Sequence, residues 1–112
     1  MPAYSFTKQF APLVQSGKKR QTVRRDDKEV HEGDVLEFYT AGKTRKLLRE
    51  ATCIRVAKVN IFQPVLYIDG ELFENGLAEA FARADGFKSF ATMRNWIDRR
   101  YGVPFEGVVV YW

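Results

Sequence analysis

The sequence predicts an α+β domain built on a mixed or closed β-sheet, because strand patterns stand near both ends of the chain and helical patterns lie between them. Near the N-terminus, Tyr4-Ser5-Phe6 alternates apolar and polar side chains as a short strand does. Near the C-terminus, Val108-Val109-Val110 is a continuous apolar run, typical of a strand covered on both faces. Between residues 77 and 101, apolar residues recur at the spacing of amphipathic helices.

Length and composition favour one folded domain over residues 1–112. The chain has 112 residues, of which 46% are hydrophobic and 14% aromatic. This apolar content is sufficient for a packed core and argues against intrinsic disorder. No stretch rich in Pro, Gly or Ser divides the sequence in two.

A short helix is expected directly after the first strand. Phe10, Leu13 and Val14 recur at helical spacing, and Gly17 follows at the position of a left-handed cap. Pro12 fits this helix only in its first turn, where a missing N–H group is harmless. The helix is therefore short.

The next part of the sequence is dominated by strand patterns. Gln21–Arg25 can run extended, Gly33-Asp34 is a turn signal, and Val35–Thr40 is rich in β-branched and aromatic residues. From Lys46 to Phe62 the apolar residues change parity, which we interpret as one long strand with a bulge near Ala57-Lys58. Such a bulge bends a strand around a barrel.

A β-hairpin is expected around Asp69-Gly70, where the apolar segments Leu66-Tyr67-Ile68 and Leu72-Phe73 flank a strong turn signal. A helix with an apolar face follows, and Gly86 can terminate it. The residues expected on that face are Leu77, Phe81 and Ala84.

A second helix is expected to begin at the N-cap residue Ser89 and to end before Gly102. Its predicted buried residues are Phe90, Met93, Ile97 and Tyr101. Its predicted solvent face carries Arg94, Arg99 and Arg100.

The composition also argues against several classes of protein. Cys53 is the only cysteine and His31 the only histidine, so no internal disulfide and no zinc-ligand set can form. We expect no metal and no cofactor. The N-terminus lacks the pattern of a signal peptide, and no apolar run approaches the roughly 20 residues that span a bilayer. A soluble, cytoplasmic monomer is the expectation.

Positive charge is concentrated in the first half of the chain. The net charge is +4, and residues 1–60 contain 13 of the 18 Lys and Arg residues but 7 of the 14 Asp and Glu residues. Within Ser16–Arg25, five of ten residues are cationic and none is acidic. Such a segment is either a solvated loop or an anion site. For the second reading, the candidate ligand-binding residues are Gly17, Lys18, Arg20, Arg24 and Arg25.

The alternation of an extended chain adds a prediction within this segment. If Gln21–Arg25 is a strand, Thr22 and Arg24 share one face, while Val23 lies on the other. Thr22 and Arg24 would then point toward one site. The guanidinium group of Arg24 offers a planar fork of donors for a phosphate or a base edge.

The motif Gly17-x-Lys19-x-x-Thr22-x-Arg24 resembles the signature of the ASCH family, a branch of the PUA-like superfamily. The resemblance extends over nearly the whole chain. The further matching segments are Phe6-x-x-x-Phe10, Leu13-Val14, Gly33-Asp34-Val35, Asp85-Gly86-Phe87 and Val108-Val109-Val110-Tyr111. The resemblance implies a β-barrel of mixed strands with flanking short helices and a cleft lined by the basic motif.

The same resemblance implies binding of RNA or of a nucleoside or nucleotide. Some small members of the family are amidohydrolases that act on N4-acetylcytidine. Their catalytic residues correspond here to Lys19, Thr22 and Asp85, where Asp85 stands in place of the family's Glu.

Three function hypotheses follow. The first is a module that binds RNA or a nucleotide. The second is a small hydrolase that deacetylates N4-acetylcytidine or cleaves RNA, and the third is a protein-interaction domain whose basic loop is incidental. For the first, a stacking platform is an alternative to a core role for the aromatic residues Tyr4, Phe6, Phe38, Tyr39 and Trp112.

Overall fold

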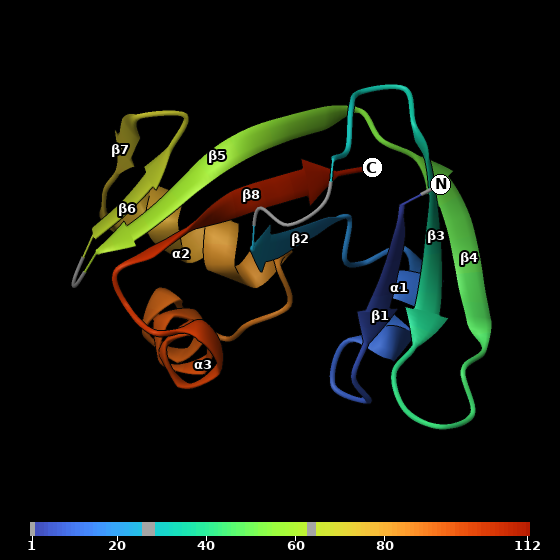
Figure 1. Ribbon diagram of the computed structural model, residues 1–112. Helices are drawn as coiled ribbons and strands as arrows, with labels where there is room; N and C mark the ends of the chain where they lie inside the picture. The colour runs from blue at the N-terminus through green and yellow to red at the C-terminus, as the bar shows by residue number, and fades with distance from the viewer. Residues whose placement is uncertain (1, 26–28, 63–64) are drawn as a thin grey trace.

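A computed structural model describes residues 2–25, 29–62 and 65–112 of the chain, which contain eight strands and three helices. Figure 1 shows them in two separate sheets. In chain order the elements are β1 (Ala3–Phe6), α1 (Ala11–Ser16), β2 (Gln21–Arg25), β3 (Val35–Thr40), β4 (Leu47–Thr52), β5 (Arg55–Phe62), β6 (Val65–Ile68), β7 (Glu71–Phe73), α2 (Asn75–Ala84), α3 (Phe90–Tyr101) and β8 (Phe105–Tyr111).

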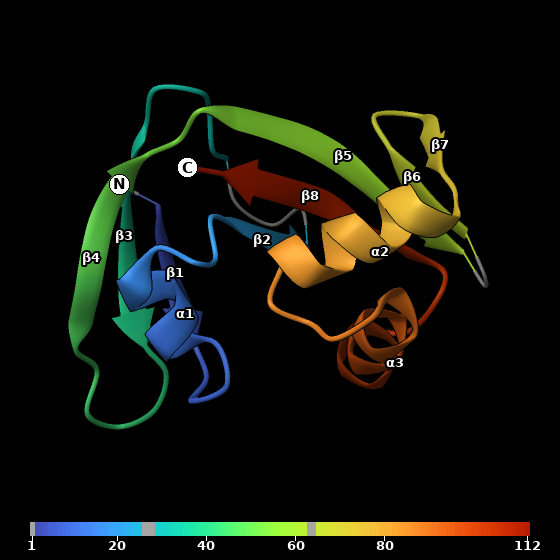
Figure 2. The same cartoon turned by 180° about the vertical axis from the view of Figure 1, so that it is seen from behind.

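The first sheet has the order β1-β3-β4, with β1 parallel to β3 and β3 antiparallel to β4. The second sheet has the order β2-β8-β5-β6-β7, and each of its pairs is antiparallel. Helix α1 packs against the first sheet. Seen from behind in Figure 2, α2 and α3 lie on one face of the second sheet. This arrangement is consistent with the α+β class.

The prediction of a closed barrel is wrong for the part of the chain that the structure describes. The strands form a three-stranded and a five-stranded sheet that are not joined edge to edge. The chain passes between them at Cys53-Ile54. The amide of Cys53 donates to the backbone oxygen of Asp34, directly before β3 of the first sheet, and the next amide, of Ile54, donates to Tyr111 O in the second sheet.

This crossing also corrects the prediction of one long strand from Lys46 to Phe62. The segment contains two strands, β4 and β5, which belong to different sheets. No bulge interrupts β5 at Ala57-Lys58, because β5 pairs with β8 in continuous register from Arg55 to Ile61. The change of apolar parity lies within β5, where Val56 is on the face opposite to Val59 and Ile61, and Ile54 is exposed between β4 and β5.

An aromatic cluster joins the two sheets. The ring of Trp112, which follows β8, lies 4.3 Å from that of Phe38 on β3 and 6.4 Å from that of Phe6 on β1. The Phe6 and Phe38 rings are 5.7 Å apart. Each of the three residues is buried, so they belong to the core and are not an exposed stacking platform.

Several local predictions are confirmed. Gly17 ends α1 with φ of 83°, and Pro12 lies in the first turn of that helix. Asp69 and Gly70 both have positive φ between β6 and β7, as a tight hairpin turn requires. The Ser89 side chain accepts a hydrogen bond from the Thr92 amide at the start of α3.

The apolar face of α2 differs from the predicted one. Leu77 is 59% exposed and Ala84 is exposed, whereas Phe81 is buried as expected. The buried partners of Phe81 on this helix are Ala78 and Ala82. The small side chains of Ala78 and Ala82 therefore face the neighbouring elements, whereas the larger side chain of Leu77 faces solvent.

Gly107 lies in the middle of the second sheet, where β8 pairs with both β2 and β5. A Cβ atom at this position would lie 2.3 Å from Arg24 O and 2.6 Å from a ring carbon of Phe105. We expect Gly107→Ala to lower the free energy of unfolding by about 1–3 kcal/mol or more, because the strand pair must separate to admit the methyl group.

Chemical denaturation measures this loss, and Gly76→Ala is the matched control. Gly76 lies in α2 with no heavy atom within 4 Å of an added Cβ. Alanine is favoured over glycine in a helix by about 0.5–1 kcal/mol. The two substitutions are therefore expected to change stability in opposite directions, and equal effects would contradict the close approach at Gly107.

No helix in residues 2–25, 29–62 and 65–112 is long and apolar enough to cross a membrane. In the same residues, no group of three or more His, Cys, Asp and Glu side chains is placed to hold a metal ion.

Candidate functional site

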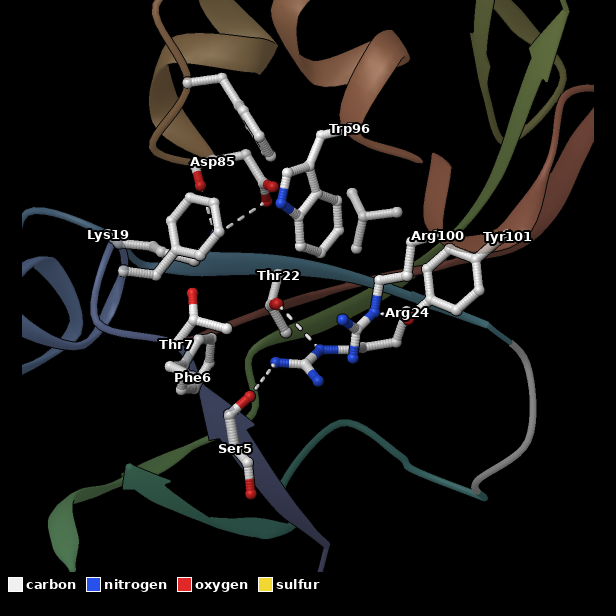
Figure 3. A pocket seen from close by; sticks show the side chains of 13 residues that line it. Ser5, Phe6, Thr7, Lys19, Thr22, Arg24, Asp85, Trp96, Arg100 and Tyr101 are labelled. Atoms are coloured by element: carbon white, nitrogen blue, oxygen red, sulfur yellow. Dashed lines mark hydrogen bonds and ion pairs between the residues drawn. The ribbon is translucent and has the colours of Figure 1, made fainter. Parts of the chain in front are cut away.

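A pocket lies where β1 and β2 meet the end of α2 and the last turns of α3 (Figure 3). Its walls are aromatic and its other lining residues are mostly polar or charged. The aromatic residues are Phe6, Phe10, Phe87, Trp96 and Tyr101. The polar and charged residues are Ser5, Thr7, Lys19, Thr22, Arg24, Asp85 and Arg100.

Lys19 and Asp85 form a buried ion pair in this pocket. Their exposed fractions are 2% and 4%, and Lys19 Nζ lies 3.3 Å from Asp85 Oδ1. The ammonium group also donates a hydrogen bond to the backbone oxygen of Asp85. Lys19 Nζ is 5.0 Å from the centre of the Phe10 ring and 6.0 Å from that of Phe6. The lysine is thus held between two rings and one carboxylate, away from water.

Burial dominates the acid–base behaviour of this pair. It lowers the pKa of Lys19 from its ordinary value of 10.5, and the attraction of Asp85 opposes the shift only in part. Burial likewise raises the pKa of Asp85 above its ordinary value of 3.8, against the opposing effects of Lys19 and Gln21. Both side chains are therefore shifted toward their neutral forms, which suits them to exchange a proton.

Gln21 is the third buried polar side chain at this position. Its Nε2 lies 3.4 Å from Asp85 Oδ1 and 3.4 Å from Phe81 O. These long contacts help to satisfy a carboxylate that has little access to water. No pattern in the sequence predicts this role for Gln21.

Thr22 and Arg24 project from β2 toward the same space, as the alternation of the strand predicted. Arg24 Nε donates to Thr22 Oγ1 at 3.1 Å, and Arg24 Nη2 donates to Ser5 O at 2.9 Å. The guanidinium carbon lies 4.9 Å from the centre of the Phe6 ring and 5.2 Å from that of Tyr4. Burial lowers the pKa of Arg24, yet a guanidinium stays protonated in proteins. Arg24 is therefore a fixed positive charge.

Arg100 and two aromatic residues of α3 form another side of the pocket. Arg100 Nε donates to Tyr101 Oη at 3.2 Å, and its guanidinium carbon is 5.3 Å from the centre of the Trp96 ring. Trp96 in turn packs edge-on against Phe87, with ring centres 5.7 Å apart. Figure 3 shows the Arg100 and Arg24 side chains reaching the same region from α3 and β2.

The pocket is small, with a volume of about 40 Å³. That volume admits a few water-sized groups. A ligand can therefore place a small group or one edge of a ring beside Lys19 and Thr22, while the rest of it contacts the arginine and aromatic side chains.

The structure brings together only some of the predicted site residues. Lys19, Thr22, Arg24 and Asp85 line one pocket, although Lys19 and Asp85 are 66 positions apart in the sequence. Lys18 and Arg20 line a separate hollow beside Ile54, Tyr111 and Trp112. Successive residues of an extended chain point to opposite sides, which separates Lys18 and Arg20 from Lys19.

Gly17 and Arg25 also lie outside this pocket. Gly17 is the cap of α1, close to the Arg49 side chain. Arg25 is exposed, donates from Nη2 to Tyr101 O at 3.4 Å and contributes to another surface hollow. Of the five predicted ligand-binding residues, Arg24 therefore lines this pocket, whereas Gly17, Lys18, Arg20 and Arg25 do not.

Sequence reasoning missed the residues that α3 contributes. Arg100 is exposed, as predicted for the solvent face of its helix, but it also lines the pocket together with Trp96. A local signal exists, because Trp96 and Arg100 are four positions apart and so share a helix face. Only the fold, however, brings that face to β2.

Comparison of the chain with protein-family models, curated proteins and solved structures finds no match. The resemblance to ASCH domains accordingly rests on the motif Gly17-x-Lys19-x-x-Thr22-x-Arg24 and its flanking segments. The chemistry of the pocket is the remaining basis for inferring its function.

Proposed function

We propose that this protein is an ASCH-type domain that binds RNA or a nucleotide-like ligand in the pocket around Arg24. The observation that carries the proposal is the convergence of Lys19, Thr22, Arg24 and Asp85 on one pocket with aromatic walls. Buried charges are costly, so their collection at a single opening favours a functional role over a purely structural one.

The groups in the pocket suit the parts of a nucleotide. Arg24 has five N–H donors, of which the contacts with Thr22 and Ser5 use two. Trp96 and Tyr101 are half-buried aromatic residues that line the pocket, so their rings can contact a base or ribose. Deeper in the pocket, Lys19 donates and Asp85 accepts hydrogen bonds, which suits the polar edge of a base.

Arg24→Ala is expected to weaken binding of single-stranded RNA or nucleotide by about 1–3 kcal/mol, because charge-assisted hydrogen bonds are lost. Titration of wild type and variant at two salt concentrations measures this effect. Arg83→Ala is the matched control, since it removes an exposed arginine that does not line the pocket. Equal affinities of the wild type and Arg24→Ala for the ligand would show that Arg24 is not part of the binding site.

A second candidate function is hydrolysis of N4-acetylcytidine, and the Lys19–Asp85 pair favours it. In this mechanism neutral Lys19 takes the proton of the Thr22 hydroxyl as its oxygen attacks the acetyl carbonyl. The protonated form of Asp85 supplies a proton to the leaving N4 group. Water then hydrolyses the acetyl ester on Thr22, so that cytidine and acetate are released and the side chains return to their initial state.

A further inference from the structure

We propose that Arg24 and Arg100 together form a phosphate-binding subsite at the pocket. The proposal rests on the function inferred above and narrows its ligand class. It assigns to the pocket a phosphorylated ligand, either a free nucleotide or a nucleotide unit of an RNA strand. An uncharged nucleoside would leave this subsite unused.

The first supporting observation is the arrangement of charge. Arg24 on β2 and Arg100 on α3 line the same pocket, and Figure 3 shows both guanidinium groups on one side of it. Among residues 2–25, 29–62 and 65–112, no carboxylate oxygen lies within 4.0 Å of either group. Asp85, which lines the same pocket, is paired with Lys19.

Two positive charges in a partly buried site repel each other, and this repulsion costs more than it would in water. The proximity of Arg100 contributes to the lowered pKa of Arg24. An anion bound between the two guanidinium groups would be attracted to both and would offset their repulsion. Phosphate fits best, because the planar guanidinium fork matches its oxygens in a bidentate contact.

The second observation is that both guanidinium groups are held in place before a ligand binds. Arg24 packs on Phe6 and donates hydrogen bonds to Ser5 and Thr22. Arg100 lies over the Trp96 ring and donates to Tyr101 Oη. A side chain that is already ordered loses less conformational entropy on binding, so these contacts favour the capture of an anion.

The third observation is the small volume of the pocket. The pocket volume of about 40 Å³ is too small for a whole nucleotide. A nucleotide would therefore extend beyond the pocket, and Arg100, an exposed residue that lines it, can contact a phosphate there. The base edge beside Lys19 and a phosphate beside Arg100 are then two ends of one ligand.

The test compares affinities for matched ligands by isothermal titration. The probes are the four common ribonucleosides, their 5′-monophosphates, and a single-stranded RNA of about ten nucleotides. Wild-type protein is expected to bind at least one monophosphate about tenfold more tightly than its nucleoside, because about 1.4 kcal/mol corresponds to a factor of ten. Arg100→Gln is expected to abolish that difference.

Arg99→Gln is the matched control, since Arg99 precedes Arg100 on the same exposed helix end but does not line the pocket. It is expected to keep the tenfold preference. With the RNA probe, Arg100→Gln is expected to lower the slope of log affinity against log salt by about one, as for loss of one phosphate contact. If Arg100→Gln lowers the salt slope for RNA and no monophosphate is preferred over its nucleoside, the result would support the subsite and identify a phosphodiester as its ligand.

Two results would overturn the proposal, and they have different meanings. Equal affinity of the wild type for nucleosides and their monophosphates, without dependence of RNA binding on Arg100, would reject the subsite and leave the proposed function standing. Failure of the folded wild type to bind any nucleoside, nucleotide or RNA would reject the proposed function and the subsite with it.

Discussion

Replacing Asp85 with alanine is expected to lower the free energy of unfolding by about 3–5 kcal/mol, the largest stability effect that we expect for any single residue of the pocket. The carboxylate is the ion-pair partner of Lys19, which is 2% exposed and packs between the rings of Phe6 and Phe10. Removing Asp85 leaves a buried ammonium group without a counter-charge. Urea denaturation of wild type and variant measures the loss.

A double variant separates the unpaired charge from the cavity that the shorter side chain leaves. Lys19→Met combined with Asp85→Ala removes both charges and keeps an unbranched apolar side chain at position 19. The double variant is expected to recover a large part of the stability, because no uncompensated charge is left in the core. A double variant as unstable as Asp85→Ala would show that the carboxylate contributes through packing.

The loss caused by Asp85→Ala is expected to shrink as the pH rises. The pKa of Lys19 is already lowered from 10.5 in the folded wild type, and removal of Asp85 takes away the interactions that oppose this shift. When the folded-state pKa lies below the unfolded value, the unfolded chain binds more protons, so stability rises with pH up to the unfolded value. The gap between variant and wild type should therefore narrow with rising pH until the lowered pKa of Lys19 in the folded wild type is reached, and stay constant above it.

The second large effect concerns turnover. If the pocket deacetylates N4-acetylcytidine, Lys19→Arg is expected to reduce the release of acetate at least about 100-fold, because a guanidinium remains protonated and cannot act as the base. Activity of the wild type should rise with pH and level off once the lowered pKa of Lys19 is passed. Turnover by Lys19→Arg equal to that of the wild type would exclude the lysine as the base.

Two substitutions of Thr22 that preserve its packing distinguish a loss of catalysis from a loss of folding. Thr22 is 3% exposed, and Thr22→Val replaces its hydroxyl with a methyl group of similar size, whereas Thr22→Ser keeps the hydroxyl. Thr22→Val is expected to lose turnover and Thr22→Ser to retain it.

Asp85→Glu tests the longer carboxylate that the family resemblance implies. An increase in the release of acetate by this variant would show that the shorter side chain of Asp85 limits proton transfer.

Local signals in the sequence predicted the elements that local chemistry decides. The N-cap at Ser89, the left-handed Gly17 and the Asp69-Gly70 hairpin each follow from backbone preferences of the residues concerned. The common direction of Thr22 and Arg24 follows from the alternation of a strand.

Features that depend on long-range pairing could not be predicted in this way. A change of apolar parity looks the same for a bulge in a strand and for apolar residues on both faces of a regular strand, and in β5 the second case holds for Val56 and Val59. The charge run from Lys18 to Arg20 suggested one site, although the extended backbone directs its members to two sides. Arg100 enters the pocket only because α3 packs near β2, which no local pattern encodes.

Binding of a nucleotide-like ligand in the pocket around Arg24 can be followed through the indole N–H signals of the two tryptophans in a nuclear magnetic resonance titration. Trp96 lines the pocket, whereas Trp112 is buried against Phe38 between the sheets. On addition of the ribonucleoside 5′-monophosphates or the short RNA, the Trp96 signal is expected to shift and saturate, and that of Trp112 to stay in place. Binding that leaves the Trp96 signal unchanged, while backbone signals of Lys18 and Arg20 shift, would contradict binding in this pocket and place the ligand on the other side of that segment.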